Sequence, residues 1–428
     1  MDTIFALATA QGRAGVSVVR ISGPKAFEIA ETISGPIPAE RVAKLREIRG
    51  LTNDVIDQAL IICFPRPASF TGEDIVELHV HGSIAVVRAV LDVLGSFDET
   101  RMAEPGEFTR RALENQKLDL AQVEGLADLI EAETEAQRKQ ALRVLSGHLG
   151  TQVELWRSNL IRAAALIEAT IDFADEDVPV DVTPEVEQLL TAVSKELIQE
   201  INGTYVAERI KTGFEVAIVG APNAGKSTLL NVLAGRDAAI TSETAGTTRD
   251  IIEVRMDLGG LAVTLLDTAG LRESDDEIEA IGVNRAIERA KHADLRVFLA
   301  SPEELLMLVP QLDDIVVMPK VDTLPVGSVG ISGKTGEGIS ELIAQIQTLL
   351  IERSASVGLA THVRHRIALE DANAYLEAAK ITLDLGPDEY DIAAEELRSA
   401  IRSLEGLVGR IDVENLLDEI FSSFCLGK

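Results

Sequence analysis

The chain has 428 residues, an apolar fraction of 46% and a formal net charge of −30 at pH 7. The length is sufficient for about three domains, and the apolar fraction is that of a folded globular protein. The large excess of carboxylates excludes a protein whose whole surface binds nucleic acid, because phosphate contacts need clustered lysine and arginine.

Cysteine use and hydropathy indicate the compartment. Cys63 lies in an apolar stretch, where it is expected to be a core residue, and Cys425 is the fourth residue from the last numbered position. Two cysteines in a chain of this length make no disulfide framework, which favours a reducing cytosol. Neither a basic signal peptide nor an apolar run of about eighteen residues is visible, so we expect a soluble, cytoplasmic protein without a membrane span.

Residues 1–117 are expected to form an α+β domain. Short β-type runs at 4–9, 16–21 and 75–80 alternate with turn signals and helical stretches. Candidate basic patches for a nucleic acid are Arg101, Arg110, Arg111 and Lys117 here, and Arg353, His362, Arg364, His365 and Arg366 further along. For the second group, a solvated linker and helix start is an equally good interpretation.

Two helical blocks flank a central α/β segment. Residues 118–211 show helical periodicity, and Thr183 followed by Pro184 predicts a helix start with a capping hydroxyl and a proline in the first turn. Residues 354–428 become helical again at 363–382 and 391–407. The pattern predicts one helical domain, 118–211 with 354–428, into which an α/β domain at 212–353 is inserted.

The inserted segment carries a complete P-loop. Residues 220–227 read Gly-Ala-Pro-Asn-Ala-Gly-Lys-Ser and follow the apolar run 214–219. Such a loop lets backbone N–H groups surround the β-phosphate, while Lys226 reaches the β/γ-oxygens and the Ser227 hydroxyl ligates Mg²⁺. A helix from 227 to 233 adds the positive end of its dipole.

Three further segments favour a GTPase. Asp267-Thr268-Ala269-Gly270 follows the strand 261–266, so Asp267 can support the Mg²⁺ shell and Gly270 can face a γ-phosphate. The polar loop 246–250 offers Thr248 as a second hydroxyl on Mg²⁺. Lys320-Val321-Asp322 follows the strand 314–318, where Asp322 can accept both N–H groups of a guanine edge, and 332–334 suits the guanine O6. These positions are where a doubly wound sheet binds ligands.

Two positions depart from a Ras-like pattern. Leu271 follows the Asp-Thr-Ala-Gly segment where a water-orienting glutamine is expected, so the attacking water needs another partner. Pro319 stands where the guanine motif Asn-Lys-x-Asp has asparagine, and proline brings neither an amide side chain nor a backbone donor. We therefore expect guanine selection to depend on Asp322 and the loop at Ser332, with weaker affinity.

Along its whole length the chain resembles the MnmE (TrmE) family of tRNA-modifying GTPases. The motifs that carry this resemblance are 2–4, 20–23, 70–78, 81–82, 103–109, 117–122 and the closing Cys-Leu-Gly-Lys at 425–428. The closing motif is far more specific than a P-loop.

The resemblance implies a catalytic cation. K⁺ would take the place of an arginine finger, held by Asn223, Ser242, Thr244 and Thr247, while Glu279 orients the water and the nucleotide domains dimerise. Without the resemblance, Glu279 reads as one more solvated carboxylate.

The catalytic residues implied are Glu279, Lys226 and Cys425, although Cys425 is equally well read as a packed small residue. Mg²⁺ would be held by Ser227 and Thr248. The GTP-binding residues are Asn223, Ala224, Gly225, Lys226, Ser227, Thr228, Ser242, Glu243, Thr244, Ala245, Gly246, Thr247, Thr248, Asp267, Thr268, Ala269, Gly270, Lys320, Asp322, Ser332, Gly333 and Lys334.

The resemblance also implies a one-carbon reaction. A tetrahydrofolate derivative, the 5,10-methylene or 5-formyl form, would bind Arg20, Glu77, Lys117 and Lys428. The implied activity is a K⁺-stimulated GTPase, homodimeric and partnered by the flavoprotein MnmG, that adds an aminomethyl or carboxymethylaminomethyl group at C5 of the wobble uridine of certain tRNAs. Glu77, His79 and His81 share a strand face, but a metal site there is the weaker interpretation because no further ligand is suitably spaced.

Two other classes remain open. A ribosome-assembly GTPase of the Era or Der type shares the nucleotide motifs but needs an RNA-binding module with a Gly-x-x-Gly clamp or a basic terminal domain, which is not evident here. A nucleotide-gated scaffold with little hydrolysis is suggested by Leu271 and Pro319. Binding of a reduced folate would argue against the ribosome factor, and cation-specific turnover would argue against the scaffold.

Overall fold

A computed structural model describes residues 2–172, 182–235, 253–267, 287–301, 308–325, 327–354, 357–410, 420–421 and 427. The chain divides into two compact units, residues 1–127 with 405–428, and residues 128–404. The predicted boundaries at 117, 211 and 353 do not follow this division and stay predictions. Within the described ranges, no helix is long and apolar enough to cross a membrane.

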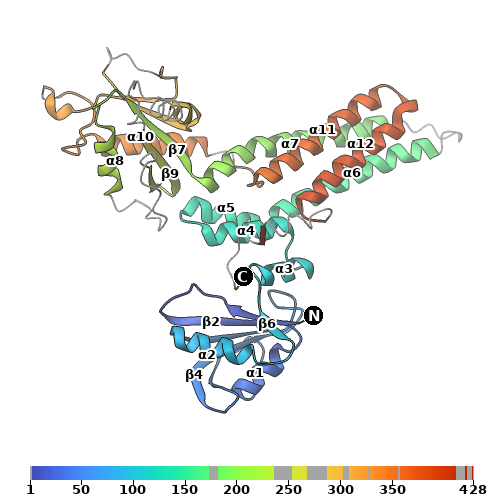
Figure 1. Ribbon diagram of the computed structural model, residues 1–428. Coiled ribbons are helices and arrows are strands. Elements are labelled where there is room, and N and C mark those ends of the chain that lie inside the picture. Colours follow the sequence, from blue (N-terminus) through green and yellow to red (C-terminus); the bar gives the residue numbers. More distant parts are fainter. Residues whose placement is uncertain are drawn as a thin grey trace, which may run out of the picture. The chain divides into compact units, whose positions relative to one another are not determined.

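The first unit contains a mixed sheet with helices on both faces (Figure 1). Its strands run in the order β3-β4-β5-β2-β1-β6, and only the β1–β6 pairing is parallel. The elements are β1 (Thr3–Leu7), β2 (Ala14–Ser22), α1 (Ala26–Ser34), β3 (Lys44–Arg49), β4 (Val55–Phe64), β5 (Ile75–Gly82), α2 (Ile84–Leu94), β6 (Thr100–Met102), α3 (Glu107–Glu114) and the start of α4 (Leu120–Glu131).

Side-chain alternation along β1 divides this unit into two apolar layers. Phe5 joins the large core formed with α1 and α2, whereas Ile4 and Ala6 pack on the opposite face with Phe108 of α3. This period of two is what a strand covered on both sides requires. Cys63 belongs to the large core, as predicted, and burial raises the pKa of its thiol to about 11.

Long helices form the body of the second unit (Figure 1). They are α5 (Glu135–Leu145), α6 (His148–Asp172), α7 (Thr183–Thr212), α11 (Val363–Asp384) and α12 (Tyr390–Leu407), with a 3-10 turn at Pro387–Glu389. Helices α7 and α11 are joined by the buried Ser194, whose hydroxyl lies 2.9 Å from Asn373 and from Glu377.

The predicted start of α7 is only partly right. Pro184 does lie in the first turn, but the N-cap is Val182 and makes no side-chain cap. The hydroxyl of Thr183 lies instead 3.3 Å from the Tyr390 hydroxyl of α12. The Thr-Pro pair marks the helix start correctly because proline fixes φ there, whereas the hydroxyl takes a tertiary partner.

An α/β segment follows α7 and ends before α11, as the sequence predicted. Its strands run in the order β11-β10-β7-β9-β8, with β7, β9, β10 and β11 parallel and β8 antiparallel. The elements are β7 (Phe214–Gly220), α8 (Lys226–Ala234), β8 (Glu253–Leu258), β9 (Leu261–Asp267), β10 (Leu295–Leu299), β11 (Ile315–Val317), a 3-10 turn (Val321–Thr323) and α10 (Ile339–Arg353). Because β9 and β10 flank β7 on opposite sides, the loop after β7 lies at the topological switch point.

Candidate functional site: a P-loop site and a second site in the amino-terminal sheet

The P-loop connects β7 to α8. Asn223 has a φ of 64° and Gly225 a φ of 101°, which are left-handed conformations that asparagine and glycine tolerate best. A Cβ built at Gly225 would meet nothing within 4 Å, so the loop is open on that side. Gly225 is also the N-cap of α8 and has no side chain to cap the helix. The first N–H groups of α8 therefore lie at the open side of the loop, where an anion can accept from them.

Lys226 begins α8 and is buried. Its ammonium group donates to the carbonyl oxygens of Gly220 at 2.7 Å and Ala221 at 3.0 Å, both in the P-loop itself. The lysine thus lies across the loop opening, where a phosphate oxygen can replace a carbonyl as acceptor.

The hydroxyl and the carboxylate that are predicted to hold Mg²⁺ come from the first turn of α8 and the end of β9. The Ser227 hydroxyl donates to Oδ2 of Asp267 at 2.8 Å, although the two residues are forty positions apart. Oδ1 of Asp267 is buried and has no hydrogen-bond partner in the described part of the chain. An unpaired buried carboxylate oxygen is costly unless a cation occupies the site, and a hydroxyl with a carboxylate is a donor set that suits Mg²⁺. The residues present therefore fit the expected ion.

The two predicted base-recognition loops are joined to each other. The Ile331 N–H donates to the Met318 carbonyl at 2.8 Å, and the Val321 N–H donates to the Ile331 carbonyl at 3.2 Å. Pro319 stands opposite Ile331 in a parallel bridge and takes part in neither bond. The loop around Asp322 is thus held in place without an asparagine at position 319.

Ser332 fixes the second of these loops. Its side chain is fully buried, and its hydroxyl accepts hydrogen bonds from the N–H groups of Lys334 at 3.2 Å and Thr335 at 3.1 Å. A Cβ built at Gly333 would stand 3.0 Å from Cγ2 of Thr228, one residue beyond Ser227. The base loops and the P-loop helix therefore border one site.

Several predicted site residues lie outside the described residues. They are Ser242, Glu243, Thr244, Ala245, Gly246, Thr247, Thr248, Thr268, Ala269, Gly270, Glu279, Cys425 and Lys428. Their roles stay predictions. Of the expected K⁺ ligands, the structure describes Asn223, which is exposed at the rim of the P-loop.

The first unit brings together two of the predicted folate residues. Nε and an NH2 nitrogen of Arg20 donate to Oε1 of Glu77 at 3.1 and 3.0 Å. The Arg20 guanidinium also lies over the rings of Phe70 and Phe108, at 5.5 and 5.6 Å from their centroids. Sequence reasoning did not assign these two phenylalanines, although Phe70 and Phe108 lie in motifs of the resemblance.

Gly427 of the closing motif lies against Arg20 as well. Arg20 donates to the carbonyl of Gly427 at 3.5 Å, and a Cβ at Gly427 would stand 2.1 Å from the Leu7 carbonyl oxygen, so only glycine fits. Lys117 lies against Gly72, where a built Cβ would stand 3.2 Å from its Cε. No described contact joins Lys117 to Arg20 or Glu77.

The histidines on β5 have separate partners. His79 lies 3.4 Å from Oε2 of Glu77, whereas Nδ1 of His81 lies 2.8 Å from Asp57. The described residues contain no group of three or more potential ligands that could hold a metal ion.

Two of the four residues of the first candidate basic patch form ion pairs within the unit. Arg111 is buried and forms ion pairs with Asp2, Glu73 and Glu107 at 2.9, 3.1 and 2.9 Å. Arg101 forms further ion pairs with Asp2 and Glu107. These guanidinium groups stabilise the unit internally and do not offer a row of unpaired charges to phosphates.

Comparison with known proteins identifies the family. The family model of the MnmE helical domain matches residues 120–425, and that of the GTP-binding protein TrmE N-terminus matches residues 3–117. The chain belongs to the MnmE (TrmE) family. The tRNA modification GTPase MnmE of Roseobacter denitrificans is 68% identical, and that of Ruegeria pomeroyi is 60% identical, each over 100% of both chains.

Among solved structures, the nucleotide segment is similar to Era of Aquifex aeolicus bound to GDP·AlF4⁻. That match has 25% identity and a TM-score of 0.27, and it covers 38% of this chain and 66% of that one. By its family the chain is a GTP hydrolase, and its P-loop segment is the part that binds GTP.

Proposed function

We propose that the chain is a cytoplasmic, homodimeric, K⁺-stimulated GTPase that modifies C5 of the wobble uridine of certain tRNAs together with the flavoprotein MnmG. The added group would be aminomethyl or carboxymethylaminomethyl. Relatives spanning the whole chain carry the name tRNA modification GTPase, which supports the tRNA substrate. The observation that carries the GTPase part is the contact of Ser227 with Asp267 beside an unpaired carboxylate oxygen.

In this proposal, each part of the P-loop site has one task. Lys226 and the first N–H groups of α8 would bind the phosphates, and Ser227, which contacts Asp267, would hold Mg²⁺ together with Asp267 and Thr248. Asp322 and the loop at Ser332 select guanine, and Glu279 positions the water. Asn223 would help to hold a monovalent cation, which would supply positive charge to stabilise the charge that develops on the phosphates.

The amino-terminal site is proposed to bind the one-carbon donor. Arg20 binds Oε1 of Glu77, and Oε2, which lies 3.4 Å from His79, has a second lone pair as an acceptor for an N–H group of a pterin edge. Lys117 and Lys428 supply positive charges for the glutamate tail of the folate, and Gly427 places the closing motif beside Arg20. A reduced folate bound there supplies the carbon, so GTP hydrolysis acts as a conformational drive.

The first test is GTP turnover in KCl and in NaCl at equal ionic strength, with ATP as the control nucleotide. We expect K⁺ to raise kcat by roughly tenfold or more with GTP only. A cation at the phosphates supplies part of the positive charge that an arginine finger supplies, and an arginine finger raises kcat by roughly 10³- to 10⁵-fold. Asn223→Ala should abolish the stimulation, and Asn231→Ala, on the exposed side of α8, should keep it. Slow turnover that is the same in both salts would favour the scaffold.

Restoring the missing amide should tighten nucleotide binding. Pro319→Asn is expected to lower the KM for GTP by about fivefold, the equivalent of one hydrogen bond of about 1 kcal/mol. The loop bonds of Met318, Val321 and Ile331 do not involve position 319, so the fold is kept. Steady-state kinetics with GTP and ATP measures the effect, with Pro325→Asn in an exposed loop as control. An unchanged KM would show that this site does not use an amide at position 319.

A reduced-folate titration separates this proposal from an Era-like ribosome factor. Wild-type chain should bind 5-formyl-tetrahydrofolate, and Glu77→Gln should weaken that binding by about tenfold or more because a charged acceptor is lost. His81→Gln, whose ring pairs with Asp57, is the matched control on the same strand. Absence of any folate binding would argue for the ribosome factor.

A further inference from the structure

The Arg20 guanidinium is not held in one orientation by its hydrogen bonds alone. Its Nε and Nη2 both donate to a single oxygen, Oε1 of Glu77, and its other hydrogen bond within the described residues, to the Gly427 carbonyl, is 3.5 Å long. Two N–H groups on two carboxylate oxygens fix the guanidinium plane, whereas two on one oxygen let that plane turn about the oxygen. The Arg20 side chain is 21% exposed, so a further contact is needed to hold it in one orientation.

Two aromatic rings supply that contact. The guanidinium carbon of Arg20 lies over the rings of Phe70 and Phe108, at 5.5 and 5.6 Å from their centroids. A guanidinium over a ring face is attracted by the ring quadrupole, and the attraction grows where water is partly excluded. These contacts restrain the rotation that two hydrogen bonds to one oxygen permit.

The two rings belong to separately anchored elements. Phe108 lies in α3, is fully buried and packs with Ile4 and Ala6 of β1. Phe70 lies between β4 and β5, packs against the same cluster and is only half-buried. The position of the Phe108 ring is thus set by the core, whereas that of Phe70 depends on its loop.

Thr71 fixes this loop to the strand that carries Arg20. The Thr71 side chain is fully buried, and its Oγ1 lies 2.7 Å from Oγ of Ser22, which follows Arg20 on β2. The Thr71 carbonyl accepts a hydrogen bond from the Asn115 side chain at 2.7 Å. Phe70 is therefore held beside Arg20 by hydrogen bonds that do not involve the Phe70 ring.

The same loop also contacts the second predicted cation of the site. Gly72 has a φ of 80°, and a Cβ built there would stand 3.2 Å from Cε of Lys117. No described contact joins Lys117 to Arg20 directly. The segment 70–72 therefore sets the position of these two cations relative to each other.

We propose that Phe70 is a positioning residue of the amino-terminal site, whose ring, with that of Phe108, holds the Arg20 guanidinium in the orientation that binds Glu77 and the Gly427 carbonyl. The consequence for folate binding rests on the proposed function, whereas the orientation of Arg20 does not. In the proposed site, an oriented Arg20 keeps Glu77 in place for the pterin edge. Phe70 thus contributes to folate binding through Arg20 and not through the ligand.

The first measurement needs no folate. In the full chain labelled with ¹⁵N-arginine, NMR gives the rate at which the Nε–H proton of Arg20 exchanges with water, and Arg20→Met identifies the signal. We expect Phe70→Leu, which keeps an apolar side chain but removes the ring, to raise this rate by about fivefold, the scale of one partly buried cation–π contact. Phe70→Tyr keeps the ring and should exchange like wild type.

Phe64→Leu is the matched control. Arg41 lies over the Phe64 ring at 5.6 Å, so this variant makes the same change at another arginine–phenylalanine contact of the same unit. It should leave the exchange at Arg20 unchanged. Hydrogen exchange of the β2 backbone amides checks the fold, and Phe70→Met, with a more adaptable side chain and no ring, replaces Phe70→Leu if β2 is loosened.

The second measurement is the affinity for 5-formyl-tetrahydrofolate in a double-mutant cycle. Phe70→Leu should weaken binding by about fivefold when Arg20 is present and should have no effect in an Arg20→Met background, because the ring acts through the guanidinium. An equal loss of affinity in both backgrounds would mean that the ring contacts the ligand itself, and it would overturn the positioning role.

The two measurements separate this inference from the function on which it partly rests. If wild type bound no folate, the folate part of the proposed function would fail, and the exchange rate at Arg20 would still decide whether Phe70 holds the guanidinium. The same exchange rate in wild type and in the ringless variant would overturn the inference, as would an unchanged folate affinity in that variant. Faster exchange and a loss of affinity that both require Arg20 support it.

Discussion

Asp322→Asn should transfer the nucleotide preference from GTP to XTP. The carboxylate of Asp322 can accept two N–H groups from guanine, whereas an asparagine places an N–H donor against one of them. Sites that depend on hydrogen bonds reject a mismatched partner strongly, and we expect kcat/KM for GTP to fall roughly 10³-fold or more. Xanthine carries a carbonyl in place of the amino group, so XTP should restore turnover.

The structure makes this variant easy to interpret. Asp322 is exposed in a short 3-10 turn, and the turn is held through backbone atoms, by the Val321 N–H on the Ile331 carbonyl. The side chain is therefore free to change without loss of the fold. Pro319 offers no donor to the base, which leaves more of the selection to this one carboxylate than in a site with asparagine.

Kinetics with GTP, XTP and ATP measures the transfer. Asp313→Asn is the matched control, because Asp313 is an exposed aspartate of the same segment that lies 3.7 Å from Arg353 and away from the base loops. If Asp322→Asn kept its preference for GTP, or gained no activity with XTP, the base would be recognised elsewhere.

How much of this site the sequence could predict depends on whether its signals are local. The P-loop, Asp267 and the base loops each follow a strand, and parallel strands end at one edge of a sheet, so their convergence could be predicted from the sequence. The contact of Ser227 with Asp267 shows this convergence for the P-loop and the end of β9. Pro184 marked the start of α7 for the same reason, because its effect on φ is local.

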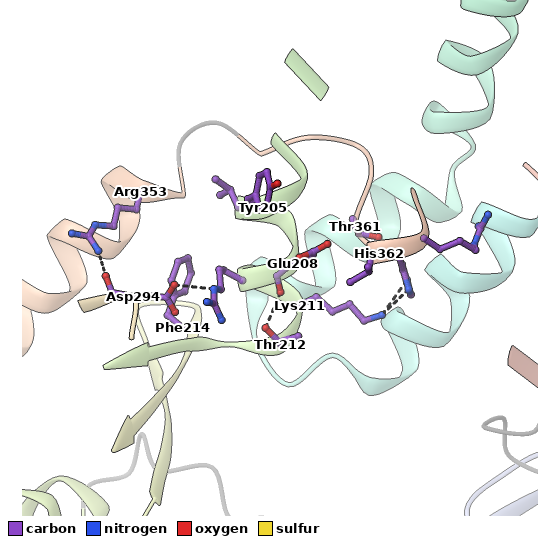
Figure 2. Close-up of a pocket in the computed structure, with 13 residues that line it drawn as sticks. Tyr205, Glu208, Lys211, Thr212, Phe214, Asp294, Arg353, Thr361 and His362 are labelled. Carbon is purple, nitrogen blue, oxygen red and sulfur yellow. Dashed lines mark hydrogen bonds and ion pairs between the residues drawn. The ribbon is translucent and has the colours of Figure 1, made fainter. Parts of the chain in front are cut away.

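Features made by remote side chains could not be predicted in this way. Arg111 looked like a candidate for binding nucleic acid, because its partners Asp2 and Glu73 are distant in sequence. A cavity of about 680 Å³ is likewise formed by the ends of α7, α10 and α11 (Figure 2). Periodicity predicts each helix but not which helix ends meet, and an unpaired hydroxyl such as that of Thr361 has no signal in the sequence.

Arg111→Met should destabilise the amino-terminal unit strongly. The Arg111 side chain is 8% exposed and bonds to Glu73 and Glu107, which are themselves 10% exposed. Removing one member of a buried ion-pair network leaves the other charges unpaired, which costs about 3–5 kcal/mol. Arg101→Met, from a side chain that is 42% exposed, should cost only about 1 kcal/mol.

Hydrogen exchange of the amides in β1 and α3 measures the stability of this unit separately from that of the rest of the chain. A loss of 3–5 kcal/mol corresponds to exchange that is roughly 10²–10⁴ times faster in Arg111→Met, against about fivefold in Arg101→Met. Equal exchange in the two variants would show that the buried pairs of Arg111 contribute no more than surface ones.

The loss should also depend on pH in a defined direction. Burial alone would raise the pKa of Glu107, but hydrogen bonds from Arg101, the Glu104 N–H and Arg111 outweigh it and hold the pKa below its usual range. A carboxyl with a lowered pKa stabilises the fold above its unfolded pKa of about 4.3, and that stabilisation disappears as the pH falls through the lower folded value. The difference between wild type and Arg111→Met should therefore be constant from about pH 6 to 7 and shrink below about pH 4. A difference that grew on acidification would mean that the network stabilises the unit through something other than its ionised carboxylates.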